Sequence, residues 1–181
     1  MTTEKPDTPP EGQIAAQDMP VTIHAQYVRD LSFENPNAPD ALRAGAKPPE
    51  MDINIGMDAR KIEDAEIKDL YEVVLNVRAA AVRDNDPVFI AELQYGVTAS
   101  IGGDVPEENH HPLLLIEMPR LAFPFVRQIM ADVTVQGGFP PLLLNPVDFH
   151  ALYMERFGKE IEEAQKAAAE AQSEAKDATI N

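Results

Sequence analysis

Alternation of apolar and polar side chains with a period of two residues dominates residues 21–101, and it restricts the possible folds more than any other feature. The pattern predicts strands over residues 21–33, 51–58, 70–83 and 88–101, because successive side chains of a strand point to opposite faces of a sheet. Only a short turn separates the last two strands, and antiparallel neighbours are joined in this way. We therefore predict a four-stranded antiparallel sheet.

Apolar residues occur on both faces of at least two of these strands. In the third strand, Val74 and Val82 fall among the polar side chains. A sheet with two apolar faces needs a second cover, which a partner subunit or a bound apolar ligand would supply, and we expect a partner subunit. In the first strand, simple alternation places four residues on one side: Val21, Ile23, Ala25 and Tyr27.

Beyond residue 101 the apolar spacing changes from two residues to about four. A stripe of this spacing predicts an amphipathic helix over residues 119–136. The pair Gly137-Gly138 follows directly, and glycine commonly ends a helix.

A second, shorter helix is predicted after the proline-rich segment 139–144, which favours extended chain. Asn145 is its predicted N-cap, with Pro146 in the first turn, and its apolar stripe continues to Ile161. The predicted fold class is therefore α+β, with the four-stranded antiparallel sheet followed by a long and a shorter helix.

One compact domain, residues 21–158, is predicted between two tails. Residues 1–20 are acidic and rich in proline, and they hold too little apolar surface to offset the entropy of ordering, so we predict a disordered leader. Residues 159–181 are rich in alanine and glutamate, which predicts a helical or disordered tail.

Charge and cysteine usage exclude several classes of protein. The chain has 31 acidic residues against 15 Lys and Arg, a net charge of −16, and no concentrated basic patch, so nucleic acid is not an expected partner. It has no cysteine, which excludes thiol catalysis, cysteine zinc sites and disulfides and favours the cytoplasm. No apolar run approaches the roughly 18 residues that span a bilayer, so we expect no membrane insertion.

No group of residues has the spacing of a catalytic or metal site. The four histidines belong to no recognisable constellation, and the adjacent His110 and His111 are expected in a solvent-exposed loop. The glycine pairs lack the spacing and the lysine of a phosphate loop. We predict a protein that is not an enzyme and needs no metal or cofactor; an enzyme acting on a small apolar ligand between sheet and helices is the remaining alternative.

Three sequence strings, at 30–39, 71–75 and 138–153, resemble the SecB family of protein-export chaperones, and the resemblance covers residues 21–158. It implies a homotetramer built as a dimer of dimers. It also implies an ATP-independent activity that holds unfolded precursor proteins in an export-competent state and delivers them to SecA, the motor of the translocon. The alternative is a general holdase or acidic adaptor of the same fold that acts on non-exported clients.

The resemblance also implies two surfaces. The candidate client-binding groove comprises Leu31, Phe33, Phe123, Phe125, Phe139 and Leu143, with ordinary core packing as the alternative for each. The candidate SecA-binding surface comprises Asp30, Glu34, Ile90 and Glu92. Many relatives have a tryptophan in the loop before the second strand, whereas this chain has no Trp, so the contribution of this loop to the groove is left open.

Overall fold

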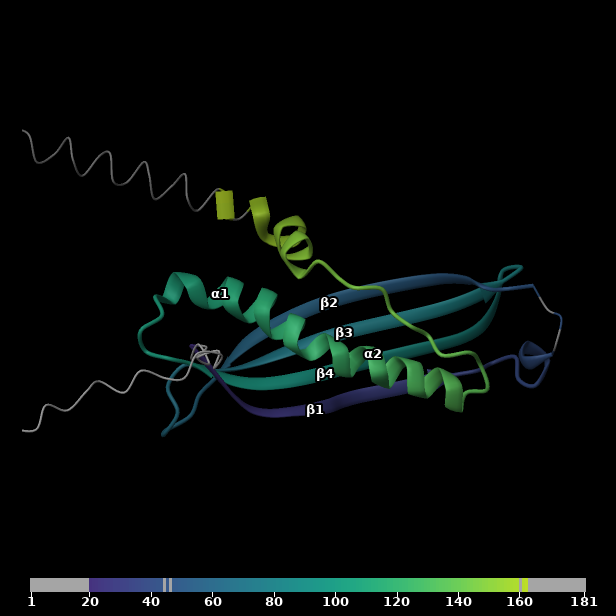
Figure 1. The fold of residues 1–181 in the computed structure, drawn as a ribbon, viewed down its shortest axis with the longest axis horizontal. Coiled ribbons are helices and arrows are strands. Elements are labelled where there is room, and N and C mark those ends of the chain that lie inside the picture. Colours follow the sequence, from purple (N-terminus) through teal and green to yellow (C-terminus); the bar gives the residue numbers. More distant parts are fainter. Residues whose placement is uncertain (1–19, 44, 46, 160, 163–181) are drawn as a thin grey trace, which may run out of the picture.

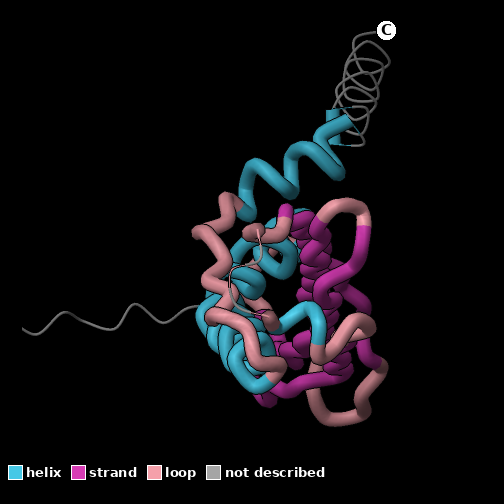
Figure 2. Tube along the Cα trace, turned by 90° about the vertical axis from the view of Figure 1, so that its right-hand side faces the viewer, coloured by secondary structure: helices cyan, strands magenta, loops and turns pink. Residues whose placement is uncertain are grey.

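Two layers make up the part of the chain that this computed structural model describes, which comprises residues 20–43, 45, 47–159 and 161–162. One layer is a four-stranded antiparallel sheet, and the other is a long helix that lies across one face of it (Figure 1, Figure 2). The predicted order of sheet, long helix and shorter helix is confirmed. Nearly all of the predicted leader and tail lies outside the described residues. Within the described ranges, no helix is long and apolar enough to cross a membrane.

The strands follow the order β1-β4-β3-β2, so β1 and β2 are the edges of the sheet. All four predicted strands are present, as β1 (Val21–Glu34), β2 (Glu50–Ile62), β3 (Leu70–Arg83) and β4 (Asp86–Ile101). β2 extends beyond its predicted end at residue 58, because its antiparallel ladder with β3 continues to the pair Ile62 and Leu70.

Two bulges in β1 move side chains between the faces of the sheet. The register with β4 shifts between Ile23 and Ala25 and again between Val28 and Asp30. Tyr27 therefore lies opposite Gly96, on the face away from the helix, and the prediction that Ala25 and Tyr27 share a side with Val21 and Ile23 is wrong. The second bulge returns Leu31 and Phe33 to the helix-covered face, opposite Leu93 and Ala91.

The long helix begins earlier than its apolar stripe predicts. A 3-10 turn (η2, Glu107–Asn109) leads into α1 (His110–Pro112), a π-helical turn (η3, Leu113–Glu117) and α2 (Met118–Gln136) without a break. The prediction that His110 and His111 lie in a loop is therefore wrong, and His110 is buried. The start of the helix is held on the sheet because Leu114, Leu115 and Ile116 are buried in the core.

The glycine pair after α2 ends the helix as predicted. Gly138 has a φ of 89°, a left-handed conformation that glycine adopts without steric cost. The N–H groups of Gly138 and Phe139 donate to the carbonyls of Val135 and Thr134, the hydrogen-bond pattern of a Schellman motif. The chain therefore leaves α2 in a fixed direction and runs back along the sheet.

The second helix starts later than predicted. Residues 149–159 are helical, and the Asp148 carboxylate accepts a hydrogen bond of 3.0 Å from the Ala151 N–H. Asp148 is thus the N-cap, and the assignment of Asn145 to that role is wrong. Leu144, which is 1% exposed, is anchored in the core, and the chain from there to residue 148 stays extended.

The core lies between α2 and the central strands. Leu75 of β3, Leu93 of β4 and Val126 and Met130 of α2 are nearly inaccessible to solvent and belong to one buried cluster. The helix covers the edge strands less well. On the same face, large apolar side chains of β1 and β2 are about 40% exposed: Ile23, Val28, Leu31, Met51 and Ile53.

Candidate functional site

An open groove of about 530 Å³ lies at the end of α2, between the β1–β2 loop and the extended segment that follows the helix. Apolar side chains that line it include Leu42 of the loop, Met51 of β2, Phe89 of β4, and Phe139 and Leu142 of the segment after α2. These side chains come from three parts of the chain that only the fold brings together. A site of this composition suits apolar side chains of a ligand.

The rings of Phe89 and Phe139 line this groove, and the Phe33 ring packs against both; we call these three rings the aromatic floor. The Phe33 ring lies 5.6 Å from Phe89 and 6.3 Å from Phe139, and Phe89 and Phe139 are 4.9 Å apart between ring centroids. Gly137 lets Phe33 approach the helix end, because a Cβ atom there would lie 2.3 Å from the ring. Of the six predicted groove residues, Phe139 therefore lines the groove, and Phe33 packs behind it in the aromatic floor.

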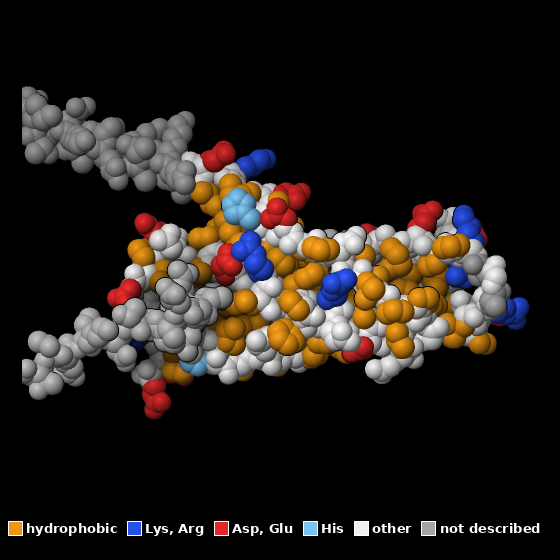
Figure 3. Space-filling model, in the orientation of Figure 1, with side chains coloured by type: hydrophobic (Ala, Val, Ile, Leu, Met, Phe, Trp, Pro, Cys, Tyr) orange, Lys and Arg blue, Asp and Glu red, His pale blue; other side chains and the backbone are white. Residues whose placement is uncertain are grey.

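Two further predicted groove residues lie along the β1 side of α2. Phe125 is 51% exposed and its ring is parallel to that of Tyr95, with centroids 6.3 Å apart. Tyr95 pairs with Val28 in β1, and Leu31 is 43% exposed on the same strand. We call Val28, Leu31, Leu121 and Phe125 the β1 apolar strip, and Figure 3 shows apolar side chains over this face of the molecule.

The remaining two predicted groove residues differ in exposure. Leu143 is 60% exposed in the extended segment after α2. Phe123 is 9% exposed and packs edge-on against Phe149, with ring centroids 5.7 Å apart. The structure thus places Phe123 in the core, under the second helix, and away from the groove.

The opposite face of the sheet brings the four predicted SecA-binding residues together. Glu34 of β1 is directly opposite Ile90 of β4, and the next position along pairs Ser32 with Glu92. Asp30 follows, opposite Gln94. Because directly paired residues project to the same face, these acids and Ile90 form one continuous surface.

Cross-strand pairing extends this surface over all four strands as three rows. The first row is Glu34, Ile90, Ala80 and Asp52; the second is Ser32, Glu92, Arg78 and Asn54; the third is Asp30, Gln94, Asn76 and Gly56. We call these twelve residues the acidic face. A depression of about 290 Å³ lies over its second and third rows.

Glu92 is not free on the acidic face. Its carboxylate accepts a hydrogen bond of 2.9 Å from Arg78 Nε, and both side chains are about half exposed. Sequence alternation could have placed Asp52 and Arg78 on this face, but nothing in the sequence indicates that Arg78 pairs with Glu92.

A buried carboxylate lies further along the same side of the sheet. Glu72 is 4% exposed and accepts hydrogen bonds from the Tyr27 hydroxyl and Arg60 Nε, with Arg29 3.5 Å away. The hydrogen bond from Tyr27, helped by the two guanidinium groups, holds the pKa of the Glu72 carboxyl below its ordinary value. Burial and the bond to Glu72 raise the pKa of Tyr27. This cluster connects β1, β2 and β3, and we assign it a role in stabilising the sheet.

The two histidines at the start of the helix also have structural roles. His110 Nε2 donates a hydrogen bond of 3.1 Å to the Val105 carbonyl oxygen, which can only accept, and its Nδ1 lies 3.0 Å from the Tyr71 hydroxyl. His111 Nδ1 lies 2.8 Å from the Tyr153 hydroxyl of the second helix. Both bonds fix the helices in place.

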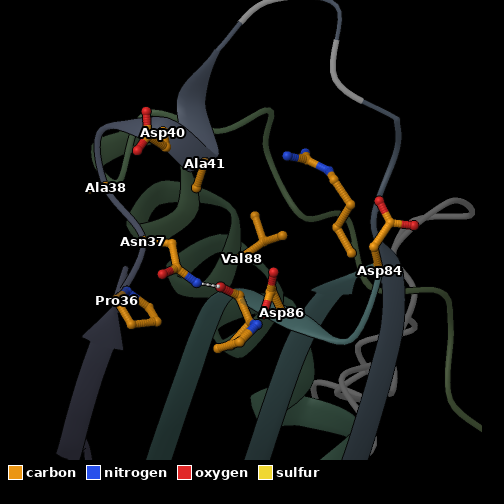
Figure 4. Close-up of a pocket in the computed structure, with 10 residues that line it drawn as sticks. Pro36, Asn37, Ala38, Asp40, Ala41, Asp84, Asp86 and Val88 are labelled. Atoms are coloured by element: carbon orange, nitrogen blue, oxygen red, sulfur yellow. Dashed lines mark hydrogen bonds between the residues drawn. The ribbon is translucent and has the colours of Figure 1, made fainter.

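A polar hollow of about 420 Å³ adjoins the apolar groove at the end of the sheet. Figure 4 shows Asp40 on the β1–β2 loop and Asp84 and Asp86 at the β3–β4 turn around it, with the Asn37 amide bonded to the Pro87 carbonyl. This hydrogen bond of 2.8 Å ties the loop to the β3–β4 hairpin. Nowhere in the described residues do three His, Cys, Asp or Glu side chains gather as metal ligands do.

Sequence reasoning missed several groove residues. Leu42 belongs to the loop that lacks the tryptophan of many relatives, whereas Met51 and Phe89 lie in β2 and β4, where the alternation predicts sheet residues. The loop thus contributes to the groove without a tryptophan. Its leucine is a weak signal in the sequence, because a single exposed leucine is common on protein surfaces.

The fold and the sequence both have known counterparts. A SecB-like chaperone from Mycobacterium tuberculosis, solved with a peptide from an antitoxin, superposes with a TM-score of 0.57 over 70% of this chain and 90% of that one, at 15% identity. Protein-export proteins named SecB from a Caulobacter species and from Maricaulis maris are 47% and 48% identical over 155 and 157 residues, or 86% and 87% of this chain and 91% and 88% of theirs. That from Bartonella bacilliformis is 50% identical over 138 residues, 76% of this chain and 84% of its own.

These similarities define the class of the molecule as a protein-export chaperone. The family model described as preprotein translocase subunit SecB matches residues 14–160. The chain belongs to the SecB family, and the resemblance seen in the sequence is confirmed over a slightly longer range than 21–158.

Proposed function

We propose that this chaperone holds unfolded precursor proteins in an export-competent state in the cytoplasm, without ATP, and delivers them to SecA. The apolar groove supports the first activity. Its lining includes the rings of Phe89 and Phe139 and the side chains of Leu42 and Met51, which are about 40% exposed. Leu143, which is 60% exposed, directly follows the lining residue Leu142 in the chain.

Client binding by such a groove is weak at each site. Burial of one large apolar side chain contributes about 1.5–3 kcal/mol before the cost of ordering the client. Several grooves on one assembly would hold a long unfolded chain through multivalency. Selectivity then depends on several apolar residues exposed along one extended client segment, because a folded protein buries most of its large apolar side chains.

The proposed assembly is a homotetramer, built as a dimer of dimers. The β1 apolar strip and the unpaired edge of β1 would otherwise face water, which is unfavourable for a strand edge with large apolar side chains. A second copy of the chain would cover this surface. Native mass, measured alone and with one unfolded precursor, tests this assembly directly; a monomer would contradict it.

Delivery to SecA is proposed to use the acidic face. Two of its carboxylates, Glu34 and Glu92, lie next to the apolar side chain of Ile90, and opposite charge favours fast, salt-sensitive association. Reversing charge at Asp30, Glu34 and Glu92 to Lys should weaken SecA binding at least tenfold and leave client binding nearly unchanged. A matched control reverses Asp104, Glu107 and Glu108, which are exposed in the loop and turn after β4. An equal loss of SecA binding in the two triple variants would contradict a specific role of the acidic face. A loss of client binding as large as the loss of SecA binding would contradict separate surfaces for SecA and for clients.

The chaperone activity itself is tested by dilution of a urea-unfolded precursor into buffer with and without the purified protein. We expect slower aggregation and slower refolding without nucleotide. No effect on either, together with no SecA binding, would refute the proposal.

A general holdase for non-exported clients is the second candidate. This candidate is supported by the structural neighbour from Mycobacterium tuberculosis, a SecB-like chaperone that was solved with a peptide from an antitoxin. Crosslinking of clients in cells separates the two functions, because export clients carry signal peptides.

A further inference from the structure

The charges of the acidic face are not equally available to a partner. In the described residues, Asp30, Glu34 and Asp52 form no ion pair, whereas Glu92 is bonded to Arg78. Arg78 is the only basic residue among the twelve positions of the three rows.

Arg78 lies at the centre of this surface. It pairs directly with Glu92 on β4 and with Asn54 on β2, and it is one row away from Ile90 and Asp52. Neighbouring strands are about 4.8 Å apart, so any cation that reaches Glu92 also comes close to the Arg78 guanidinium. A basic partner therefore meets both competition for the carboxylate and repulsion from a like charge.

We propose that Arg78 competes with a basic partner for the Glu92 carboxylate and thereby weakens binding of that partner to the acidic face. This inference depends on the proposed use of the acidic face for delivery. It assigns Arg78 the role of keeping the complex with the partner short-lived, which suits a chaperone that has to hand over its client and leave.

The size of the effect follows from the exposure of the pair. Arg78 and Glu92 are 46% and 49% exposed in their side chains, and ion pairs of this kind contribute little to stability. Arg78→Gln should therefore leave the fold intact and tighten binding by about two- to fivefold. The gain should shrink as salt increases, because both the competition and the repulsion are screened.

Lys61→Gln is the matched control. Lys61 also forms an exposed ion pair, 3.0 Å from Asp69, but it pairs with Tyr71 on the helix-covered side of the sheet. Both variants change the net charge equally, so a general increase in electrostatic attraction would affect them alike.

The experiment measures the Kd of purified SecA for the assembled wild-type protein and both variants at low and high salt, with binding of an unfolded precursor as a second readout. A gain for Arg78→Gln that exceeds that of Lys61→Gln, with client binding unchanged, supports the inference. Equal gains, or weaker binding by Arg78→Gln, would overturn it and leave the delivery proposal standing. A wild-type protein that holds clients but does not bind SecA would overturn the delivery proposal and this inference with it.

Discussion

Replacing Gly137 with alanine should displace the Phe33 ring from the aromatic floor of the groove. A Cβ atom at this position would lie 2.3 Å from both Cε1 and Cζ of Phe33, whereas ordinary van der Waals contact begins at 3.4 Å. The ring therefore has to move by about 1 Å, but Phe89 and Phe139 pack on it. Overpacking of this kind costs about 1–3 kcal/mol of unfolding free energy.

Two comparison variants isolate this steric effect. Gly158→Ala makes the same substitution inside the second helix, where the new methyl group meets only the Met154 Cε atom at 3.6 Å, so it should stabilise the protein by up to about 1 kcal/mol. Phe33→Leu removes the three ring atoms that would clash with the new Cβ. In that background, Gly137→Ala should cost less than about 0.5 kcal/mol, because a cycle of this kind reports the direct coupling of the two sites.

Urea unfolding followed by circular dichroism, at one fixed protein concentration, measures these differences. Client affinity should fall for Gly137→Ala, because the floor of the groove is disturbed. An unchanged unfolding free energy for Gly137→Ala, or an equal cost in the Phe33→Leu background, would refute the proposed contact.

Two further predictions concern stability. Glu72→Gln should lower the unfolding free energy by about 1–2 kcal/mol at pH 7, because it removes a charge-assisted hydrogen bond. Folding lowers the pKa of Glu72 below its ordinary value of 4.5, so its contribution to stability is present above that pH and is lost as the pH falls further. The difference between wild type and variant in urea unfolding should therefore shrink between pH 7 and pH 3, and a constant difference would contradict the prediction. Asp148→Ala should cost about 1 kcal/mol through the lost N-cap, whereas Asn145→Ala should cost much less in the same assay, and the reverse ranking would place the cap at Asn145.

Much of the fold could be predicted because its strands obey local rules. The third strand has the predicted bounds, and Gly137-Gly138 ends the long helix as predicted. The errors occur where tertiary contacts override local pattern. The first bulge in β1 places Tyr27 on the face of the sheet opposite to the predicted one, where it covers Gly96 and bonds to Glu72. Leu144 is buried in the core, and the chain stays extended past Asn145.

The candidate sites were less predictable than the fold. Glu34, Ile90, Glu92 and Asp30 lie together because the alternation and the register of β1 and β4 agree. Groove residues could not be separated from core residues in the same way. The sequence does not distinguish Phe123 from Phe33 and Phe139. Only packing shows that Phe123 is covered by Phe149, whereas the other two belong to the aromatic floor of the groove.

The sequence alone determined the period-two strands, the helical stripe, the acidic excess and the family strings, because each is a property of neighbouring residues or of their composition. The tertiary structure decided what depends on distant residues meeting. It paired Arg78 with Glu92 across two strands, brought Leu42 to Gly138, and left β1 with apolar side chains that α2 does not cover. Strand register and helix placement fix these contacts, and neither can be read from a single segment of the chain.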